Sequence, residues 1–197
     1  IVTRCRHLSF VLLSLNVALA SPLLMQGRSV LSGIRKRGTP DTLAVGKLGL
    51  QGDEQADLDV HGGLRKAVYA FPSEHYPWWQ QQRAARGAPD PEQILPWGFL
   101  GENLTLQGLT EADIHVGDQL HFPDCVLRVS EPRQPCDKLV HVMGYPQAAR
   151  DMVQHERCGW YLAVEQAGSL RAGQHGTLVP GSRQTPVASL LRRHRNL

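Results

Sequence analysis

The sequence predicts a mainly β protein, either a barrel or a sandwich, with a few short helices. Short runs of β-favouring residues, bounded by Gly, Pro and Asp, recur along most of the chain, whereas helical patterns are few. The connections between these runs are irregular and do not alternate strand with helix, which argues against a fold of βα units. The 197 residues are 42% hydrophobic and 20% charged, which excludes wholesale disorder and suits a single domain.

The expected strands are short and are spread over most of the chain. Residues 117–130 have the pattern of a hairpin, with Pro123 and Asp124 at the turn and Val126 and Leu127 supplying β-favouring side chains. In chain order, the expected strands are residues 10–17, 43–45, 67–70, 103–106, 119–122, 126–130, 160–164 and 176–179.

Three short helices are expected around these strands. Ser73 precedes the first, and in the last Thr185 stands at the cap and Pro186 at the first helical position. The first two cover residues 74–86 and 146–155. The predicted organisation is therefore an N-terminal tail (1–9), one domain (10–182) and a short basic C-terminal helix (183–197).

The start of the chain imitates a secretory signal peptide, because Arg4 and Arg6 precede an apolar run that ends in small residues. Ser9, Ser14 and Asn16 interrupt that run, and it is too short to span a bilayer. Of the two interpretations, a strand is favoured. The four cysteines include no closely spaced pair, so neither a disulfide framework nor a paired-cysteine zinc site is expected, and a reducing cytoplasmic location fits better.

The charge of the chain is weakly basic, with a formal net charge of +3. This is far less than the concentrated positive face of a protein that binds a nucleic acid polymer, and no partner membrane is expected either. Two basic runs, residues 35–37 and 192–195, are most simply solvated surface.

The densest group of polar residues lies between residues 49 and 66, where four acids and His61 fall within nine positions. The spacing matches neither a calcium-binding EF-hand loop nor a zinc-binding helix. Gly62 and Gly63 could turn backbone N–H groups toward an anion, with Lys66 nearby to neutralise it. An ordinary exposed turn between strands explains the same residues equally well.

Cys136 stands in unusual surroundings for a cysteine. Two prolines stiffen the chain before it, and Arg133 and Lys138 can lower the pKa of its thiol. A thiolate in such a place is either a nucleophile or a ligand for a soft metal. Cys125 and Cys158 read instead as small buried hydrophobic residues.

Two further possibilities stay open from the residues alone. Cys136 could pair with His61 or His141 as a hydrolase nucleophile, although no protease signature surrounds it. In the group Gly101-Glu102-Asn103, the polar side chains could belong to a pocket or to a turn before a strand.

Taken together, these residues resemble the MOSC family, named for the C-terminal domain of molybdenum cofactor sulfurase, and most closely its stand-alone bacterial YiiM-like branch. The likeness covers about residues 11–180. The segments that carry it are Gly33-Ile34 with Lys36, Gly49 to Asp53 with Asp57, His61-Gly62-Gly63, Lys66-Ala67-Val68-Tyr69, Gly101-Glu102-Asn103-Leu104-Thr105, Pro132-Arg133-Gln134-Pro135-Cys136 with Lys138-Leu139, and Gly159-Trp160-Tyr161.

The resemblance implies a barrel-like β fold, with residues 10–17 as its first strand. It implies that Cys136 is the metal ligand of a molybdenum cofactor and that no pyridoxal phosphate site is present. The residues expected to contact the pterin, its phosphate or the metal centre are Ser32, Gly33, Lys36, Gly62, Gly63, Lys66, Asn103, Arg133 and Lys138.

The function that the resemblance implies is an oxidoreductase that reduces N-hydroxylated small molecules, such as hydroxylaminopurine-like bases. Cys136 would hold the metal, Lys36 and Arg133 would supply positive charge, and His61 or Asp57 would deliver protons. An electron-donor protein is the expected partner, and the oligomeric state is open. The alternatives are a carrier of the cofactor or of sulfur without turnover and, more weakly, a metal-free Cys-His hydrolase.

Overall fold

The computed structural model describes residues 8–56 and 62–193. Seven strands form its central sheet: β1 (Leu8–Val17), β7 (Val68–Pro72), β8 (Leu104–Gln107), β9 (Gln119–His121), β10 (Val126–Pro132), β11 (Trp160–Gln166) and β13 (His175–Val179). The remaining strands are β2 (Ser21–Met25), β3 (Arg28–Ser32), β4 (Arg37–Thr39), β5 (Leu43–Gly46), β6 (Gly49–Leu50) and β12 (Gly168–Leu170). The helices are α2 (Tyr76–Ala85), α3 (Asp137–Met143), α4 (Ala148–Gln154) and α5 (Val187–Arg193), with short 3₁₀ turns η1 (Leu64–Lys66) and η2 (Ser73–His75).

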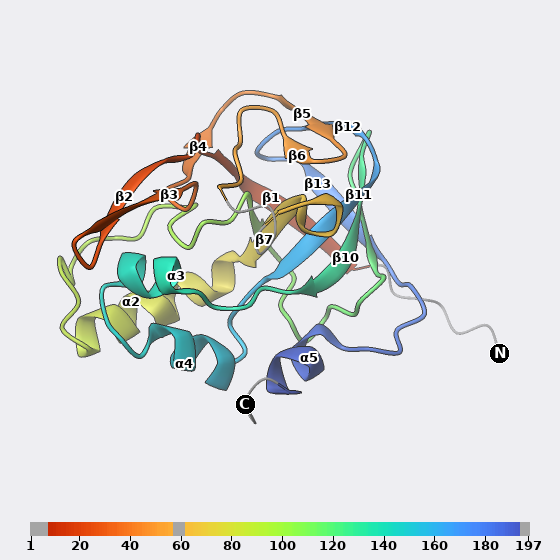
Figure 1. The fold of residues 1–197 in the computed structure, drawn as a ribbon. Coiled ribbons are helices and arrows are strands. Elements are labelled where there is room, and N and C mark those ends of the chain that lie inside the picture. Colours follow the sequence, from red (N-terminus) through yellow and green to blue (C-terminus); the bar gives the residue numbers. More distant parts are fainter. Residues whose placement is uncertain (1–7, 57–61, 194–197) are drawn as a thin grey trace.

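The central sheet closes into a barrel. Its strands follow the order β13-β9-β10-β11-β7-β8-β1, and a further pairing between β1 and β13 joins the two ends. β4 adds to β1 outside the closed ring. Among the described strand pairs, β7–β8 is parallel and the others are antiparallel. Figure 1 shows α2, α3 and α4 gathered on one side of this barrel. The expectation of a mainly β barrel with a few short helices is therefore confirmed.

Strand β7 separates two hydrophobic cores. Val68 and Ala70 point into the barrel, whereas Tyr69 and Phe71 point outward, where they join the side chains of the helices in a second core. Successive side chains of a strand point to opposite faces, so a strand covered on both sides is apolar throughout. All five residues of β7 are buried for this reason.

The N-terminal segment, which resembled both a signal peptide and a strand, forms strand β1. It pairs with β8, β4 and β13, and its Phe10, Leu12 and Leu15 side chains are buried in the barrel. The strand interpretation of residues 10–17 is thus confirmed, with a start at Leu8. Among the described residues, none of the helices has the length and apolar character needed to cross a membrane.

Two elements of the structure are absent from the strands and helices expected from the sequence. The first is the β2–β3 hairpin, which begins at Ser21 and Pro22; Pro22 is tolerated there because this two-stranded sheet consists only of edge strands. The second is α3, which directly follows Cys136. Leu139 and Met143, four residues apart, bury one face of that helix, and Gly144 ends it in the left-handed conformation.

Candidate functional site

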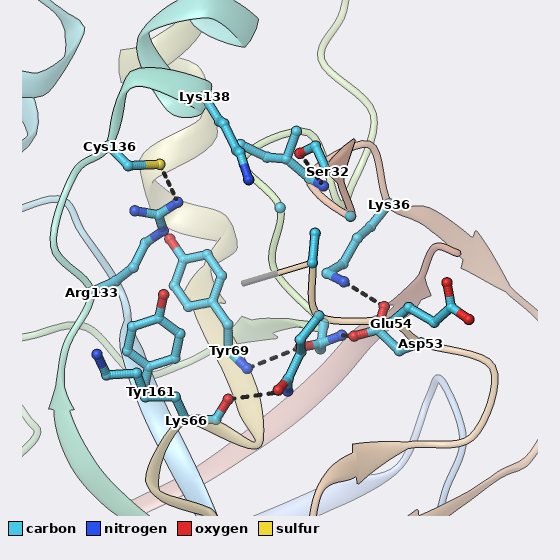
Figure 2. A pocket seen from close by; sticks show the side chains of 16 residues that line it. Ser32, Lys36, Asp53, Glu54, Lys66, Tyr69, Arg133, Cys136, Lys138 and Tyr161 are labelled. Atoms are coloured by element: carbon cyan, nitrogen blue, oxygen red, sulfur yellow. Dashed lines mark hydrogen bonds and ion pairs between the residues drawn. The ribbon is translucent and has the colours of Figure 1, made fainter. Parts of the chain in front are cut away.

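A pocket open on one side lies on the outer face of the barrel (Figure 2). Its volume is about 80 Å³, so a ligand larger than a few atoms would extend beyond it through the open side. Eight of the residues expected at a site line this pocket, although they come from segments far apart in the sequence: Ser32, Gly33, Lys36, Lys66, Asn103, Arg133, Cys136 and Lys138. Gly62 and Gly63 are not among its described lining residues, and Asp57 and His61 lie outside the described residues.

Cys136 presents its sulfur to the pocket. Its side chain is half-buried, and its backbone is extended immediately before α3. Arg133 Nη2 lies 3.5 Å from Cys136 Sγ, and Figure 2 shows the two side chains pointing toward one another. A guanidinium donor at this position favours negative charge on the sulfur.

Arg133 is held rigidly beside that sulfur. The residue is 4% exposed, its guanidinium carbon lies 5.3 Å from the centre of the Tyr69 ring, and Nη1 donates to the carbonyl of Gln134. Burial opposes its charge, but the neighbouring Tyr161, Tyr69 and Cys136 outweigh this and raise the pKa of Arg133 above its ordinary value. Arg133 Nε is buried and has no hydrogen-bond partner among the described residues. The site therefore contains a fixed positive charge with one unused donor.

Two tyrosines form the floor of the pocket. Tyr69 on β7 and Tyr161 on β11 are directly opposite one another in the strand register, and their ring centres are 5.5 Å apart. Burial raises the pKa of both hydroxyls above the ordinary value, so both remain neutral near pH 7. Tyr69 donates its hydroxyl hydrogen to the carbonyl of Cys158 at 2.8 Å, which fixes the ring.

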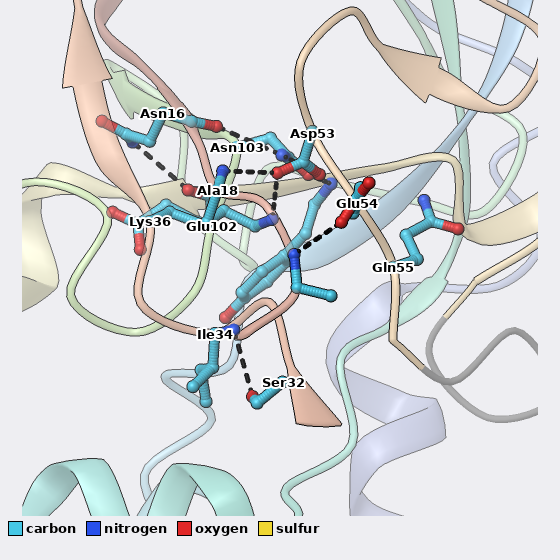
Figure 3. Close-up of polar contacts among 12 residues, drawn as sticks. Asn16, Ala18, Ser32, Ile34, Lys36, Asp53, Glu54, Gln55, Glu102 and Asn103 are labelled. Carbon is cyan, nitrogen blue, oxygen red and sulfur yellow. Dashed lines mark hydrogen bonds and ion pairs between the residues drawn. The ribbon is translucent and has the colours of Figure 1, made fainter. Parts of the chain in front are cut away.

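The opposite wall is a buried ion pair. Lys36 Nζ contacts Asp53 Oδ1, and the two side chains are 8% and 4% exposed. Asp53 also accepts hydrogen bonds from Asn103 Nδ2 at 2.9 Å and from the backbone N–H of Ala18 at 3.0 Å, as Figure 3 shows. The positive charge expected from Lys36 is therefore balanced inside the protein. Asn103 is likewise engaged, since its Oδ1 accepts the N–H of Tyr69 at 3.0 Å.

Ser32 and Gly33 shape the turn at the pocket edge. Ser32 Oγ accepts the N–H of Ile34 at 3.2 Å, an arrangement that holds the turn closed. A Cβ atom at Gly33 would lie 2.4 Å from the carbonyl oxygen of Glu54, so this position requires a glycine. Both residues have a structural reason to be there, whatever they contact in a ligand.

Lys66 and Lys138 bring two more cations to the pocket. Lys138 Nζ donates to the carbonyl of Leu31 at 2.9 Å. Lys66 Nζ lies 3.8 Å from Glu131 Oε2 and 5.6 Å from the centre of the Tyr161 ring. Lys138 has no carboxylate partner among the described ion pairs, so its charge can act on a ligand.

The glycine pair expected to cradle an anion is used differently where the structure describes it. Gly63 has a φ of 86°, which favours glycine, and its N–H donates to Gln55 Oε1 at 3.2 Å. That N–H is therefore engaged within the chain and does not point to an open anion site.

The other two described cysteines are buried, as expected. Cys125 and Cys158 have no exposed surface. Burial raises the pKa of the Cys125 thiol to about 12 and that of Cys158 well above its ordinary value. Within residues 8–56 and 62–193, no group of three or more His, Cys, Asp or Glu side chains is arranged to hold a metal ion.

Sequence reasoning did not select Tyr69, Tyr161, Asp53 or Glu54 as site residues, yet all four line the pocket. The alternation of side chains along each strand could have predicted that Tyr69 and Tyr161 both point out of the barrel. That the two rings contact each other depends on the pairing of β7 with β11. Asp53 belonged to the acidic group noted in the sequence, and its role as partner of Lys36 had no sequence signal.

A profile of the MOSC domain matches residues 57–176. The chain belongs to the MOSC domain family. Among curated proteins, it is 35% identical to the uncharacterized protein YflK of Bacillus subtilis over 164 residues, which are 83% of this chain and 71% of YflK. It is 36% identical to YiiM of Escherichia coli over 141 residues, which are 72% of this chain and 61% of YiiM.

Solved structures agree with this MOSC assignment. The crystal structure of YiiM from Geobacillus stearothermophilus superimposes with a TM-score of 0.73 at 31% identity, covering 94% of this chain and 83% of that one. The MOSC domain thus resembles the stand-alone bacterial YiiM-like proteins. It is also 32% identical to a protein named reductase from Gibberella moniliformis, over 75% of this chain but only 25% of that longer protein.

Proposed function

We propose that this MOSC domain binds a molybdenum cofactor through Cys136 and reduces N-hydroxylated small molecules, such as hydroxylaminopurine-like bases. The observation that carries the proposal is the Cys136 sulfur, which lines a pocket 3.5 Å from the Arg133 guanidinium. The similarity to a protein named reductase supports redox chemistry in this family.

The donor set fits such a group. A thiolate suits a soft, high-valent metal, and Arg133, Lys66 and Lys138 suit an anionic phosphate. Arg133 Nε is buried, and no described residue accepts a hydrogen bond from it, so it is a donor that a ligand could use. A molybdenum cofactor is larger than the 80 Å³ of the pocket, so part of it would extend through the open side.

When bound, the cofactor supplies two-electron transfer and exchange of oxygen at the metal. Cys136 would ligate the metal through Sγ, and Arg133 would hold that sulfur in its charged form. Tyr69 and Tyr161 would present a flat, neutral wall to a planar base. Asp57 and His61 remain our candidates for proton delivery, and Lys36 acts through its ion pair with Asp53.

Purification from two hosts tests the proposal, one able and one unable to make the pterin. We expect molybdenum and pterin to copurify only from the first, and both to be lost in Cys136→Ser. Purified from the second host, the parent and Cys136→Ser should have the same melting temperature, because neither then carries a stabilising cofactor. Cys125→Ser is a poor control because that residue is buried; Asp137→Asn, an exposed neighbour of Cys136, is the matched one. Metal retained in full by Cys136→Ser would refute the ligand assignment.

Activity then separates the enzyme from its rivals. Reduction of an N-hydroxylated base with an electron donor, dependent on molybdenum, supports the enzyme, whereas binding without turnover supports a carrier. Of the two histidines considered for a metal-free hydrolase, His141 lines a different cleft, and His61 lies outside the described residues. Full activity without molybdenum would support the hydrolase. The proposal places the protein in a reducing compartment such as the cytoplasm, where Cys136 stays a free thiol, and gives it an electron-donor protein as partner.

A further inference from the structure

A second cleft, separate from the Cys136 pocket, is strongly basic. It measures about 680 Å³, which is within the range of small-molecule sites. The loop between β3 and β4, α2, α3 and residues 93–99 form its walls. It shares only Lys36 with the Cys136 pocket, and no carboxylate is among its described lining residues.

Three arginines of this cleft form no ion pair with a carboxylate among the described residues. Arg35 and Arg37 are exposed and take part in none of the ion pairs among the described residues. Arg83 is 3% exposed and donates only to backbone carbonyls, from Nε to Met143 at 3.1 Å and from Nη2 to Pro89 at 2.8 Å.

Arg83 also carries an unused donor. Its Nη1 is buried and has no hydrogen-bond partner among the described residues, while the guanidinium carbon lies 5.2 Å from the centre of the Phe99 ring. Burial lowers the pKa of Arg83 below its ordinary value, and the nearby Asp90 offsets this only in part, so an external anion beside the guanidinium would stabilise its charge further. The two backbone carbonyls fix Arg83 in the cleft wall, so it acts there as a permanent positive charge.

An aromatic wall lies next to these charges. Trp97 lines the cleft, is 38% exposed, and is held edge-to-face against Tyr76 with ring centres 4.6 Å apart. A ring on the ligand could therefore rest against Trp97 without rearrangement of the protein.

We propose that this cleft binds a phosphomonoester, with the phosphate on Arg35 and Arg37 above the fixed charge of Arg83 and the organic part against Trp97. A guanidinium group can donate two parallel hydrogen bonds to the oxygens of a phosphate. Several guanidinium groups together therefore favour a doubly charged phosphate over a ligand that carries one carboxylate. The uncompensated charges also raise the local concentration of anions in the cleft. This inference does not depend on the proposed function of Cys136.

Calorimetry on the full chain tests the proposal, with adenosine monophosphate, ribose 5-phosphate and adenosine as probes. We expect both phosphates to bind and adenosine not to bind. The nucleotide should bind more tightly than the sugar phosphate if the base contacts Trp97; equal affinities would still support the phosphate site and would identify the phosphate as the recognised part.

Arg35 and Arg37 are the variants of choice, because Arg83 also donates to backbone carbonyls and its removal would disturb folding. Arg35→Ala with Arg37→Ala should weaken both phosphates by about tenfold or more, as expected for lost charged hydrogen bonds. Arg171→Ala, an exposed arginine outside the cleft, should leave the affinity unchanged. Absence of phosphate binding, or equal weakening by Arg171→Ala, overturns the proposal, as does nucleotide binding that the double variant leaves intact.

Discussion

The Arg133 guanidinium lies between a thiol and an aromatic ring, with Nη2 3.5 Å from Cys136 Sγ and Cζ 5.3 Å from the centre of the Tyr69 ring. The ring and the surrounding burial prevent Arg133 from turning to solvent. The cation is therefore fixed beside the sulfur, and the reactivity of Cys136 depends on it.

Arg133→Gln removes the charge but retains hydrogen-bond donors. We expect alkylation of Cys136 by iodoacetamide at neutral pH to slow by about tenfold, because less of the thiol is ionised. Peptide mass spectrometry measures the rate. Cys125 and Cys158 serve as internal references, since burial and their raised pKa values should keep them unmodified in the folded protein. An unchanged rate in a folded variant would contradict the role of Arg133.

The Lys36–Asp53 pair should be far more important to stability than its single contact suggests. Asp53→Asn leaves Lys36 buried without its partner, which we expect to lower the free energy of unfolding by about 3–5 kcal/mol in urea denaturation. Adding Lys36→Met should restore much of the loss. Glu54→Gln, at the exposed neighbour, is the matched control and should cost less than about 1 kcal/mol. An Asp53→Asn loss no larger than this control would show that Lys36 reaches water.

Gly33 should tolerate no side chain. In Gly33→Ala, the new Cβ would lie 2.4 Å from the carbonyl oxygen of Glu54, so the two backbone segments must separate, at a cost of about 1–3 kcal/mol. Gly46→Ala is the control, because a Cβ at Gly46 would have no neighbour within 4 Å. Thermal unfolding compares them. Equal melting temperatures for the two variants would mean that the turn at the pocket edge adapts freely.

Glu102 makes stability depend on pH. It is fully buried, and burial raises the pKa of its carboxyl above the ordinary 4.5, although hydrogen bonds from Tyr76 and Gly98 oppose the shift. A carboxyl with a raised pKa in the folded state contributes stability below pH 4.5 that is lost as the pH rises through the folded pKa. Glu102→Gln has no such proton to lose, so its unfolding free energy relative to the parent should increase with pH above 4.5. Urea denaturation at several pH values measures this, and a difference that stays constant would contradict the shift.

Local patterns were sufficient for most of the barrel. The predicted hairpin at residues 117–130 is present as β9 and β10, because β-branched side chains and a Pro-Asp turn act within a few residues. The helix after Cys136 was missed for the opposite reason. Seven residues give too little periodicity to recognise. Leu139 and Met143 form the buried face of a helix only because they pack in the second hydrophobic core, outside the barrel.

In the site too, some features follow from the local sequence and others only from tertiary contacts. Cys136 stood out in the sequence because prolines and charges are poor neighbours for a buried thiol, and the structure places it at a pocket. Lys36 was expected to offer its charge to a ligand, yet Asp53, seventeen residues further on, already balances it. No periodicity or spacing announces that pairing, because it depends on how two loops meet.

From the amino-acid order alone, one can determine that the chain is mainly β and that Cys136 is its distinctive thiol, since strand patterns and local composition are short-range properties. The choice of a MOSC-type barrel over a sandwich came from the resemblance of its motifs to that family. Only the tertiary structure decided which cations remain available, which tyrosines form the pocket floor, and that Arg35, Arg37 and Arg83 share a second cleft. Those facts arise from contacts between segments distant in the chain, where closure of the barrel and burial, not local preference, determine each partner.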